Sequence, residues 1–464
     1  MSDQQCKQDK PASGFSCNHG QAWDNLALND SRRVPAFLLE DRSKYLGSEP
    51  LSPERYTSAQ FFQLELEKMW PNVWQFAARV EELPEVGDTV LYENAGRSYI
   101  LVRQQDGTIR AFHNVCLHRG RKLRTTNGSV KELRCPYHAW TWKLDGSIQQ
   151  VPCRWDFAHL KDEELQLPEA QVDQWAGYVF IKESDGGPTL LEFLDVLPEH
   201  FERWEHERRY TTQWAAKVVP ANWKAVAEAF MEAFHVIATH PQIMPFTGDA
   251  NSKYNLYGDH VNLAITPFGD TSPHLKDRQL SEQEVMNAFL RYNGRVVPQG
   301  ETITVPEGKT ARETMGAFNR ERFAKQAGID LDHASDAELQ DALTYNLFPN
   351  FSPWGGFSPN VVYRWRPWHD QDHTLMEVRI LDYVPAGQPT PRAAPMRMLA
   401  DDEPWAAALG VLGSIVDQDM GNLPHVQTGM KASKNGKLHL ANYQESRIRH
   451  FHQTLDKYLG ADNE

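Results

Sequence analysis

Two short motifs constrain this chain more than any other feature: Cys-x-His at 116–118 and Cys-x-x-His at 135–138, with sixteen residues between them. Two thiolates on one iron and two imidazoles on the other can hold a [2Fe–2S] cluster. The spacing therefore predicts one iron on Cys116 and Cys135 and the other on His118 and His138. A zinc site uses the same residue types, but such sites usually begin with two closely spaced cysteines, so the pattern favours the cluster.

Composition excludes several classes of protein. The chain has 464 residues and a formal net charge of −14, which argues against general nucleic-acid binding. No run approaches the ~20 apolar residues that span a bilayer. The first 30 residues are polar and lack a secretory apolar core, so we expect a cytoplasmic protein.

Residue patterns divide the chain into four parts. Residues 1–50 read as an N-terminal arm and 51–72 as a helical lead-in. Short β-rich runs with turn signals between them fill 73–185, which predicts a small antiparallel β domain around the cluster. Residues 186–464 mix helices with aromatic-rich strands and predict a larger catalytic domain, so the fold class is α+β.

The motif sequences CLHRG (116–120) and CPYHAW (135–140) resemble the oxygenase (alpha) component of Rieske non-heme iron aromatic-ring-hydroxylating oxygenases. That family usually has Gly where Ala139 stands. The resemblance implies a small all-β Rieske domain and a catalytic domain with an antiparallel sheet and helices of the helix-grip (START-like) type. It also implies a second, mononuclear iron.

His235 and His240 are the candidates for that second site. A regular helix over 221–240 would place them about 140° apart around its axis, so the helix must distort or end between them. Pro241 disfavours helical geometry at His240. Two His and one carboxylate form the facial triad of oxygen-activating Fe(II). Ordinary core or surface histidines are the alternative, and the cluster motif favours the triad.

The third ligand is expected far along the chain, in a predicted helix over 403–420. An acid eight residues before Gln427 resembles the family's late motif, which favours Asp419 over Asp417. The two side chains would be about 200° apart on a helix, so only one can face the iron. Solvated acids at a helix end are the alternative.

Glu232 stands where the family has its bridging acid, and Glu resembles the carnitine- and choline-type branch. By resemblance, Glu232 would link His138 of a neighbouring subunit to His235 and relay electrons and protons without binding iron. The family forms head-to-tail trimers, some with a small second subunit. Electrons from NAD(P)H would arrive through a separate reductase, directly or through a ferredoxin, because the chain has no nucleotide-binding fingerprint.

Three functions stay open at this stage. One is hydroxylation, by mono- or dioxygenation, of an apolar aromatic or alicyclic substrate. The second is oxidative N- or O-demethylation, and the third is electron transfer with an inactive second site. Aromatic residues at 354–368 predict either a substrate pocket or plain core, and residues 270–345 either a lid or a surface insertion.

Overall fold

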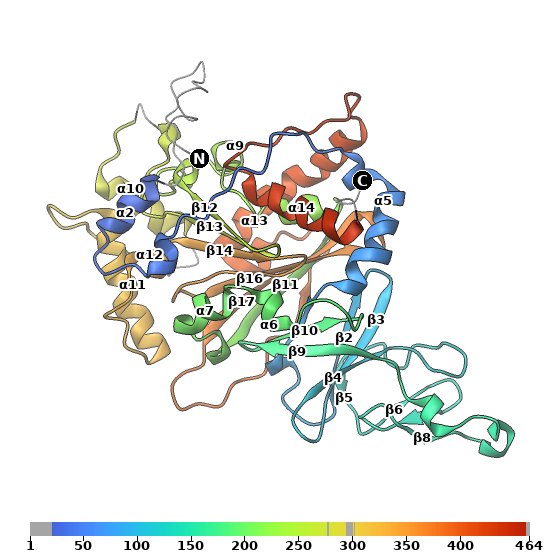
Figure 1. Ribbon diagram of the computed structural model, residues 1–464. Helices are drawn as coiled ribbons and strands as arrows, with labels where there is room; N and C mark the ends of the chain where they lie inside the picture. The colour runs from blue at the N-terminus through green and yellow to red at the C-terminus, as the bar shows by residue number, and fades with distance from the viewer. Residues whose placement is uncertain (1–20, 276–277, 294–299, 301, 461–464) are drawn as a thin grey trace.

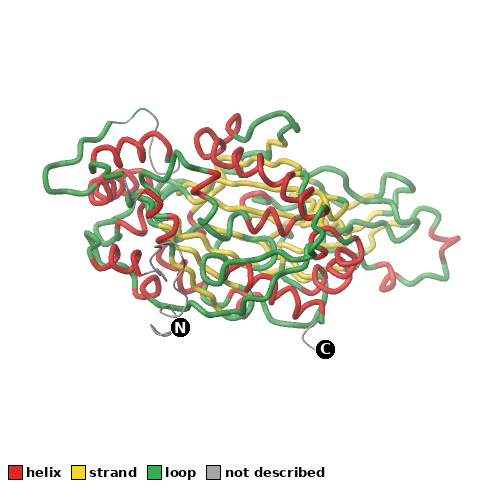
Figure 2. The backbone as a smooth tube through the Cα atoms, turned by 90° about the horizontal axis from the view of Figure 1, so that it is seen from above, coloured by secondary structure: helices red, strands yellow, loops and turns green. Residues whose placement is uncertain are grey.

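The computed structural model describes residues 21–275, 278–293, 300 and 302–460. A β-rich lobe lies beside a larger part built from antiparallel strands and helices, which confirms the expected fold class (Figure 1). Seen from above, strands run through the centre of the molecule and helices lie along its sides (Figure 2). Within the described residues, no helix is both long and apolar enough to cross a bilayer.

The β-rich lobe contains strands β1 to β10, all of which lie within the β-rich region 73–185 that the sequence predicted. One sheet has the order β1-β10-β9-β4-β3-β2-β5, and a second has the order β6-β7-β8. The strands are β1 (Gln75–Arg79), β2 (Asp88–Asn94), β3 (Arg97–Arg103), β4 (Ile109–His113), β5 (Gly128–Ser129), β6 (Leu133–Arg134), β7 (Thr141–Trp142), β8 (Ile148–Gln150), β9 (Glu169–Trp175) and β10 (Tyr178–Lys182).

The larger part contains two sheets with the orders β15-β16-β17-β11-β18 and β12-β13-β14. A bridge between Thr344 and Trp354 joins their edges. All pairs are antiparallel except β11 with β18. The strands are β11 (Arg209–Val219), β12 (Lys253–Tyr257), β13 (Val261–Thr266), β14 (Ala342–Leu347), β15 (Ser352–Pro353), β16 (Asn360–Trp368), β17 (Asp370–Tyr383) and β18 (Arg397–Met398).

Helices surround these sheets. The long helix α13 packs against β11 and α8, and α14 packs against β12 and β13. The α-helices are α2 (Gln21–Leu28), α3 (Ala36–Leu39), α4 (Glu54–Thr57), α5 (Ala59–Leu64), α6 (Leu190–Leu194), α7 (Leu197–Phe201), α8 (Trp223–Glu228), α9 (Val236–Thr239), α10 (Glu282–Tyr292), α11 (Ala311–Ala327), α12 (Asp336–Gln340), α13 (Ala406–Lys431) and α14 (Ser446–Leu459).

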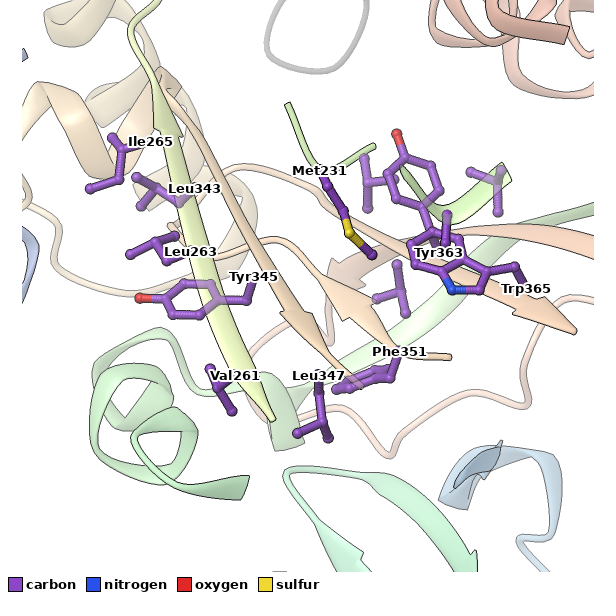
Figure 3. Packing of buried hydrophobic residues seen from close by; sticks show 14 of the residues in the cluster. Met231, Val261, Leu263, Ile265, Leu343, Tyr345, Leu347, Phe351, Tyr363 and Trp365 are labelled. Carbon is purple, nitrogen blue, oxygen red and sulfur yellow. The ribbon is translucent and has the colours of Figure 1, made fainter. Parts of the chain in front are cut away.

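Strands β13 and β14 have two different faces, because alternate residues of a strand point to opposite sides. One face belongs to the main core: Figure 3 shows Val261, Leu263 and Ile265 of β13 beside Leu343, Tyr345 and Leu347 of β14. Ala264 and Thr266 of β13 and Ala342 and Thr344 of β14, on the other face, line a cavity. The alternating pattern thus builds the core and one cavity wall at once.

One expectation changes here, and the described residues of 270–345 take a definite structure that leaves both of their expected roles open. The arm expected over 1–50 is folded from Gln21 onward: Trp23 is fully buried and its Nε1 donates to Asp341 Oδ2 at 3.0 Å. Residues 1–20 lie outside the described part. The described residues of 270–345 include three α-helices, α10 to α12, each begun by a capping box of Ser or Thr with Glu three residues later. These boxes are Ser281–Glu284, Thr310–Glu313 and Ser335–Glu338.

Candidate functional site

The two Cys/His motifs of the β-rich lobe lie together. The ring centroids of His118 and His138 are 4.6 Å apart, and both Cys116 and Cys135 are buried. Trp140 stacks flat on His118, with centroids 5.1 Å apart and planes within 5°. His138 is exposed and His118 is half-buried. The structure therefore brings the four predicted cluster residues to one place, with one imidazole facing outward.

The two cluster loops have the same backbone turn. In each, the Cys N–H donates to the carbonyl five residues later, Arg121 or Trp140, at 2.8 Å. Each Cys carbonyl accepts from the N–H four residues later, Gly120 or Ala139, at 3.0 Å. These two residues have φ of 74° and 59°, the left-handed region that suits glycine. Ala139 accepts this conformation at a cost of about 1 kcal/mol.

Local chemistry at these loops fits an iron–sulfur group. Nδ1 of His118 is buried and has no hydrogen-bond partner among the described residues. Burial lowers the pKa of His118, and His138 and Arg119 lower it further, so the ring is neutral as a metal ligand must be. Burial raises the pKa of the Cys116 thiol, as does the neighbouring Cys135. A bound metal would deprotonate both thiols.

The second predicted site also comes together. His235, His240 and Asp419 each offer one ligand atom, and these atoms lie within 4.8 Å of one another. Asp419 Oδ1 is 2.9 Å from His240 Nε2 and 3.5 Å from His235 Nε2. Two neutral nitrogens and one carboxylate oxygen are the donor set that suits Fe(II).

The helix predicted over 221–240 is wrong as a continuous element. Helix α8 ends at Glu228, a turn follows, and α9 is one short turn with His235 just before it and His240 just after it. Met231 of the intervening turn is fully buried in the core. The short helix thus holds the two imidazoles near each other, with a ring-centroid distance of 5.1 Å.

Helix α13 differs from its predicted bounds, because it continues to Lys431 instead of ending near 420. Of the two candidate acids on it, only Asp419 faces the histidines. Asp417 accepts from the backbone N–H groups of Trp405 at 2.7 Å and Ala406 at 3.1 Å, which lie in the short helical piece before the break of α13 at Gly410 (φ 58°, ψ −134°). The geometry separates the two acids as their helical spacing predicted.

Each histidine has a hydrogen-bond partner on its other nitrogen. Glu232 binds His235 twice, through Oε1 to Nδ1 at 2.6 Å and through Oε2 to the backbone N–H at 3.0 Å. Gln418 Oε1 lies 2.9 Å from His240 Nδ1 and accepts from Gln242 at 2.6 Å. Sequence reasoning found Glu232 but missed Gln418, whose position beside Asp419 on α13 was the available signal. Such partners fix the orientation of metal-binding imidazoles.

Two carboxylates act on the titration of His235. Burial alone would lower the pKa of His235, but the carboxylates of Glu232 and Asp419 raise it to about 9. A divalent cation at the triad would face the same two carboxylates and would compete with a proton for His235.

A cavity of about 1000 Å³, its open mouth included, adjoins the three residues. Most of its wall is apolar, and aromatic rings come from Phe230, Trp354 and Tyr363. Phe230 and Tyr363 pack with centroids 4.5 Å apart. Of the five aromatic residues suggested between 354 and 368, Trp354 and Tyr363 line the cavity, whereas Phe357 and Trp365 are core. Trp368 lines a different pocket.

A groove on the opposite side of the triad is acidic. It is lined by Glu228, Glu232 and Glu445 together with His235 and Asp419. Burial raises the pKa of Glu228 to about 8 and that of Glu445 to about 7. Glu232 and the two triad residues therefore border both the cavity and this groove.

Two family models match the chain. The Rieske [2Fe-2S] domain matches residues 73–161. The ring hydroxylating alpha subunit (catalytic domain) matches residues 200–461, more than half of the chain.

Individual relatives agree with these matches. The carnitine monooxygenase oxygenase subunit of Acinetobacter pittii is 35% identical over 40% of this chain and 51% of its own length. The glycine betaine monooxygenase oxygenase subunit of Chromohalobacter salexigens is 31% identical over 58% of this chain and 59% of its own. The large oxygenase component of the Pseudomonas putida naphthalene 1,2-dioxygenase system is 33% identical over 39% and 42%. The chain spans about half the length of the relatives it matches.

Solved structures share the fold over most of their length. A quaternary ammonium Rieske monooxygenase with L-carnitine bound has a TM-score of 0.61 at 19% identity and covers 88% of this chain and 95% of its own. Naphthalene 1,2-dioxygenase with indole bound has a TM-score of 0.63 at 21% identity and covers 91% and 95%. With a Rieske [2Fe–2S] domain followed by the matching catalytic domain, the chain belongs to the ring-hydroxylating alpha-subunit family.

Proposed function

We propose that this chain is the terminal oxygenase of a multicomponent Rieske system and hydroxylates an apolar, aromatic or alicyclic substrate with O₂. The observation that carries the proposal is the position of His235, His240 and Asp419 at the wall of an aromatic-lined cavity. Cys116, His118, Cys135 and His138 would hold the [2Fe–2S] cluster, and the three cavity residues would hold one Fe(II). When bound, these groups supply stored electrons and O₂ activation.

The protein's own residues prepare the site. Glu232 holds the Nδ1 proton of His235 at 2.6 Å, and Gln418 fixes the ring of His240. Both contacts leave the Nε2 atoms facing Asp419. Phe230, Trp354 and Tyr363 provide flat apolar walls that position a ring and keep water away.

The placement of the two sites supports electron delivery between two copies of the chain. In Figure 1 the cluster lobe, marked by β6 and β8, lies at the far end of the molecule from α9. His138 is exposed on that lobe, and Glu232 borders the acidic groove. We propose a head-to-tail trimer, with or without a small second subunit, in which Glu232 connects the cluster of one copy to His235 of the next. A reductase, directly or through a ferredoxin, would reduce the cluster.

Metal content and oxygen consumption test the proposal together. Purified holoenzyme should contain about three irons per chain, two in the cluster and one at the triad. With a surrogate reductase and NADH, it should consume O₂ and incorporate labelled oxygen into a hydroxylated product. Full iron content with no O₂ uptake across a substrate panel would instead indicate an electron carrier.

Oxidative N-demethylation is the second candidate. It is supported by the carnitine and glycine betaine monooxygenase subunits among the relatives and by Glu232 at the bridging position. Aromatic walls also suit this reading, because a quaternary ammonium binds well over aromatic rings. Release of formaldehyde from a methylated amine, measured beside ring hydroxylation in the same panel, separates the two functions.

A further inference from the structure

Arg447 of α14 is a charged residue of the cavity that the proposed chemistry leaves unused. Its side chain is fully buried and lines the same cavity as the triad. Among the described lining residues it is the only Lys or Arg. A buried guanidinium in a mostly apolar wall is costly unless an anion accompanies it.

The protein supplies Arg447 with neutral partners only. Nε donates to Asn262 Oδ1 at 2.6 Å, and Nη1 to the carbonyl of Met231 at 3.1 Å and to Thr344 Oγ1 at 3.4 Å. Nη2 is buried and has no hydrogen-bond partner within the described chain. Burial lowers the pKa of Arg447 to about 9, so the group still carries its charge at neutral pH.

Several buried arginines of this chain have a carboxylate partner. Arg312 binds both carboxylate oxygens of Asp341, at 2.5 and 2.9 Å, and Arg364 binds Glu377 at 2.6 Å. Arg209 and Arg449 donate to backbone carbonyls and form no ion pair with a described carboxylate, but unlike Arg447 neither lines the cavity. No described carboxylate forms an ion pair with Arg447. The nearby acid, Glu232, already accepts two hydrogen bonds from His235.

We infer that Arg447 binds a carboxylate of the substrate, so that the substrate is an acid with an apolar or methylated body. This inference rests on the proposed oxygenase function and names its substrate class. Nη2 would donate to the carboxylate oxygen while Asn262, Met231 and Thr344 hold the guanidinium in place. The aromatic walls would then position the rest of the molecule next to the triad.

Binding to the holoenzyme tests this without turnover. We would titrate two matched pairs by calorimetry: 2-naphthoate against 2-naphthamide, and glycine betaine against choline. A charge-assisted hydrogen bond predicts a preference of about tenfold or more for the carboxylate in at least one pair. A preference in the naphthoate pair would indicate an aromatic acid as substrate, and a preference in the glycine betaine pair would indicate a betaine. Absence of the preference in both pairs overturns the inference and needs no variant.

Two variants locate the preference. Arg447→Met should lose it, with the carboxylate weakened about tenfold and its partner compound nearly unaffected. Arg449→Met is the matched control: Arg449 lies on the same helix and donates to the carbonyls of Glu49 and Leu440, away from the cavity. It should keep the preference. Arg447→Lys, which retains a charge, should keep part of it and serves if the Met variant does not fold.

The outcomes also separate this inference from the oxygenase proposal. A carboxylate bound to the iron itself would keep its advantage in Arg447→Met at unchanged iron content, which overturns the role of Arg447. Binding through Arg447 without O₂ uptake would leave the carboxylate site standing and remove the oxygenase function. Equal turnover of the carboxylate and its partner compound would support the oxygenase function and overturn the carboxylate site at Arg447.

Discussion

Asp419 approaches His240 to 2.9 Å through Oδ1, while Asp417, two residues earlier on the same helix, accepts from the backbone N–H of Trp405 at 2.7 Å. Two acids of this helix, two residues apart, therefore have different partners. This arrangement supplies a matched pair of variants at the second metal site.

Asp419→Ala should remove the mononuclear iron, because it deletes the only anionic donor of the triad. Iron content should fall from about three to about two per chain, while the visible spectrum of the cluster stays unchanged. Asp417→Ala should keep the iron and cost about 1 kcal/mol of stability through the lost hydrogen bonds to the backbone. Iron retained with turnover in Asp419→Ala would contradict the assignment.

Gln418→Leu should weaken iron binding about ten- to a hundredfold, because His240 loses the acceptor that orients its ring. The measurement is iron retention during titration with a chelator, followed by the activity of reloaded protein. Gln242→Leu is the control, since Gln242 contacts Gln418 and not the imidazole. Equal iron retention in wild type and Gln418→Leu would rule out the orienting role.

Glu232→Gln should slow reoxidation of the reduced cluster by O₂ in a single turnover with substrate bound. The amide keeps the shape of Glu232 but removes the charge that binds the proton of His235 Nδ1. Iron content, measured in the same sample, separates a relay defect from metal loss. A wild-type reoxidation rate at full iron content would count against the relay.

Ala139→Gly should stabilise the cluster lobe by about 1 kcal/mol, because glycine relieves the left-handed backbone at φ 59°. Gly120→Ala, the equivalent position in the first loop with φ 74°, should destabilise it by a similar amount. Loss of visible absorbance on heating reports the stability of the lobe. Shifts of the same sign in both variants would be inconsistent with this account.

Glu377 should make the fold sensitive to acid. Burial alone would raise the pKa of Glu377, but Arg364, Arg366 and Arg379 lower it to about 2. A depressed folded pKa stabilises the protein above the ordinary Glu value of about 4.3, and this stability is lost as the pH falls from there toward 2. Glu377→Gln should cost about 3–5 kcal/mol at neutral pH, because it leaves buried arginines uncompensated. Denaturant unfolding at pH 7 and at pH 3 should show a difference between variant and wild type that is smaller by about 2 kcal/mol at the lower pH.

How much the sequence could predict depended on how local each interaction is. The cluster loops are compact turns, so spacing alone brought Cys116, His118, Cys135 and His138 together. Helical geometry allowed only one of Asp417 and Asp419 to face the iron, and the resemblance to the family's late motif favoured Asp419. The break before His235 was not predictable from helix composition, because residues 221–240 are rich in helix-forming residues on both sides of it. Arg447 gave no signal at all, since its partners Asn262 and Thr344 are distant in sequence.

The length of the helical turn α9 fixes the separation of the two histidines of the second site. His235 and His240 stand at its two ends, and each residue of a helix adds about 100° of rotation and about 1.5 Å of rise. Deleting or inserting one residue within 236–239 would rotate one imidazole by about 100° around the turn and move it by about 1.5 Å along the axis, while every side chain of the triad remained present. The five-residue interval is therefore as much a part of the site as the three side chains themselves.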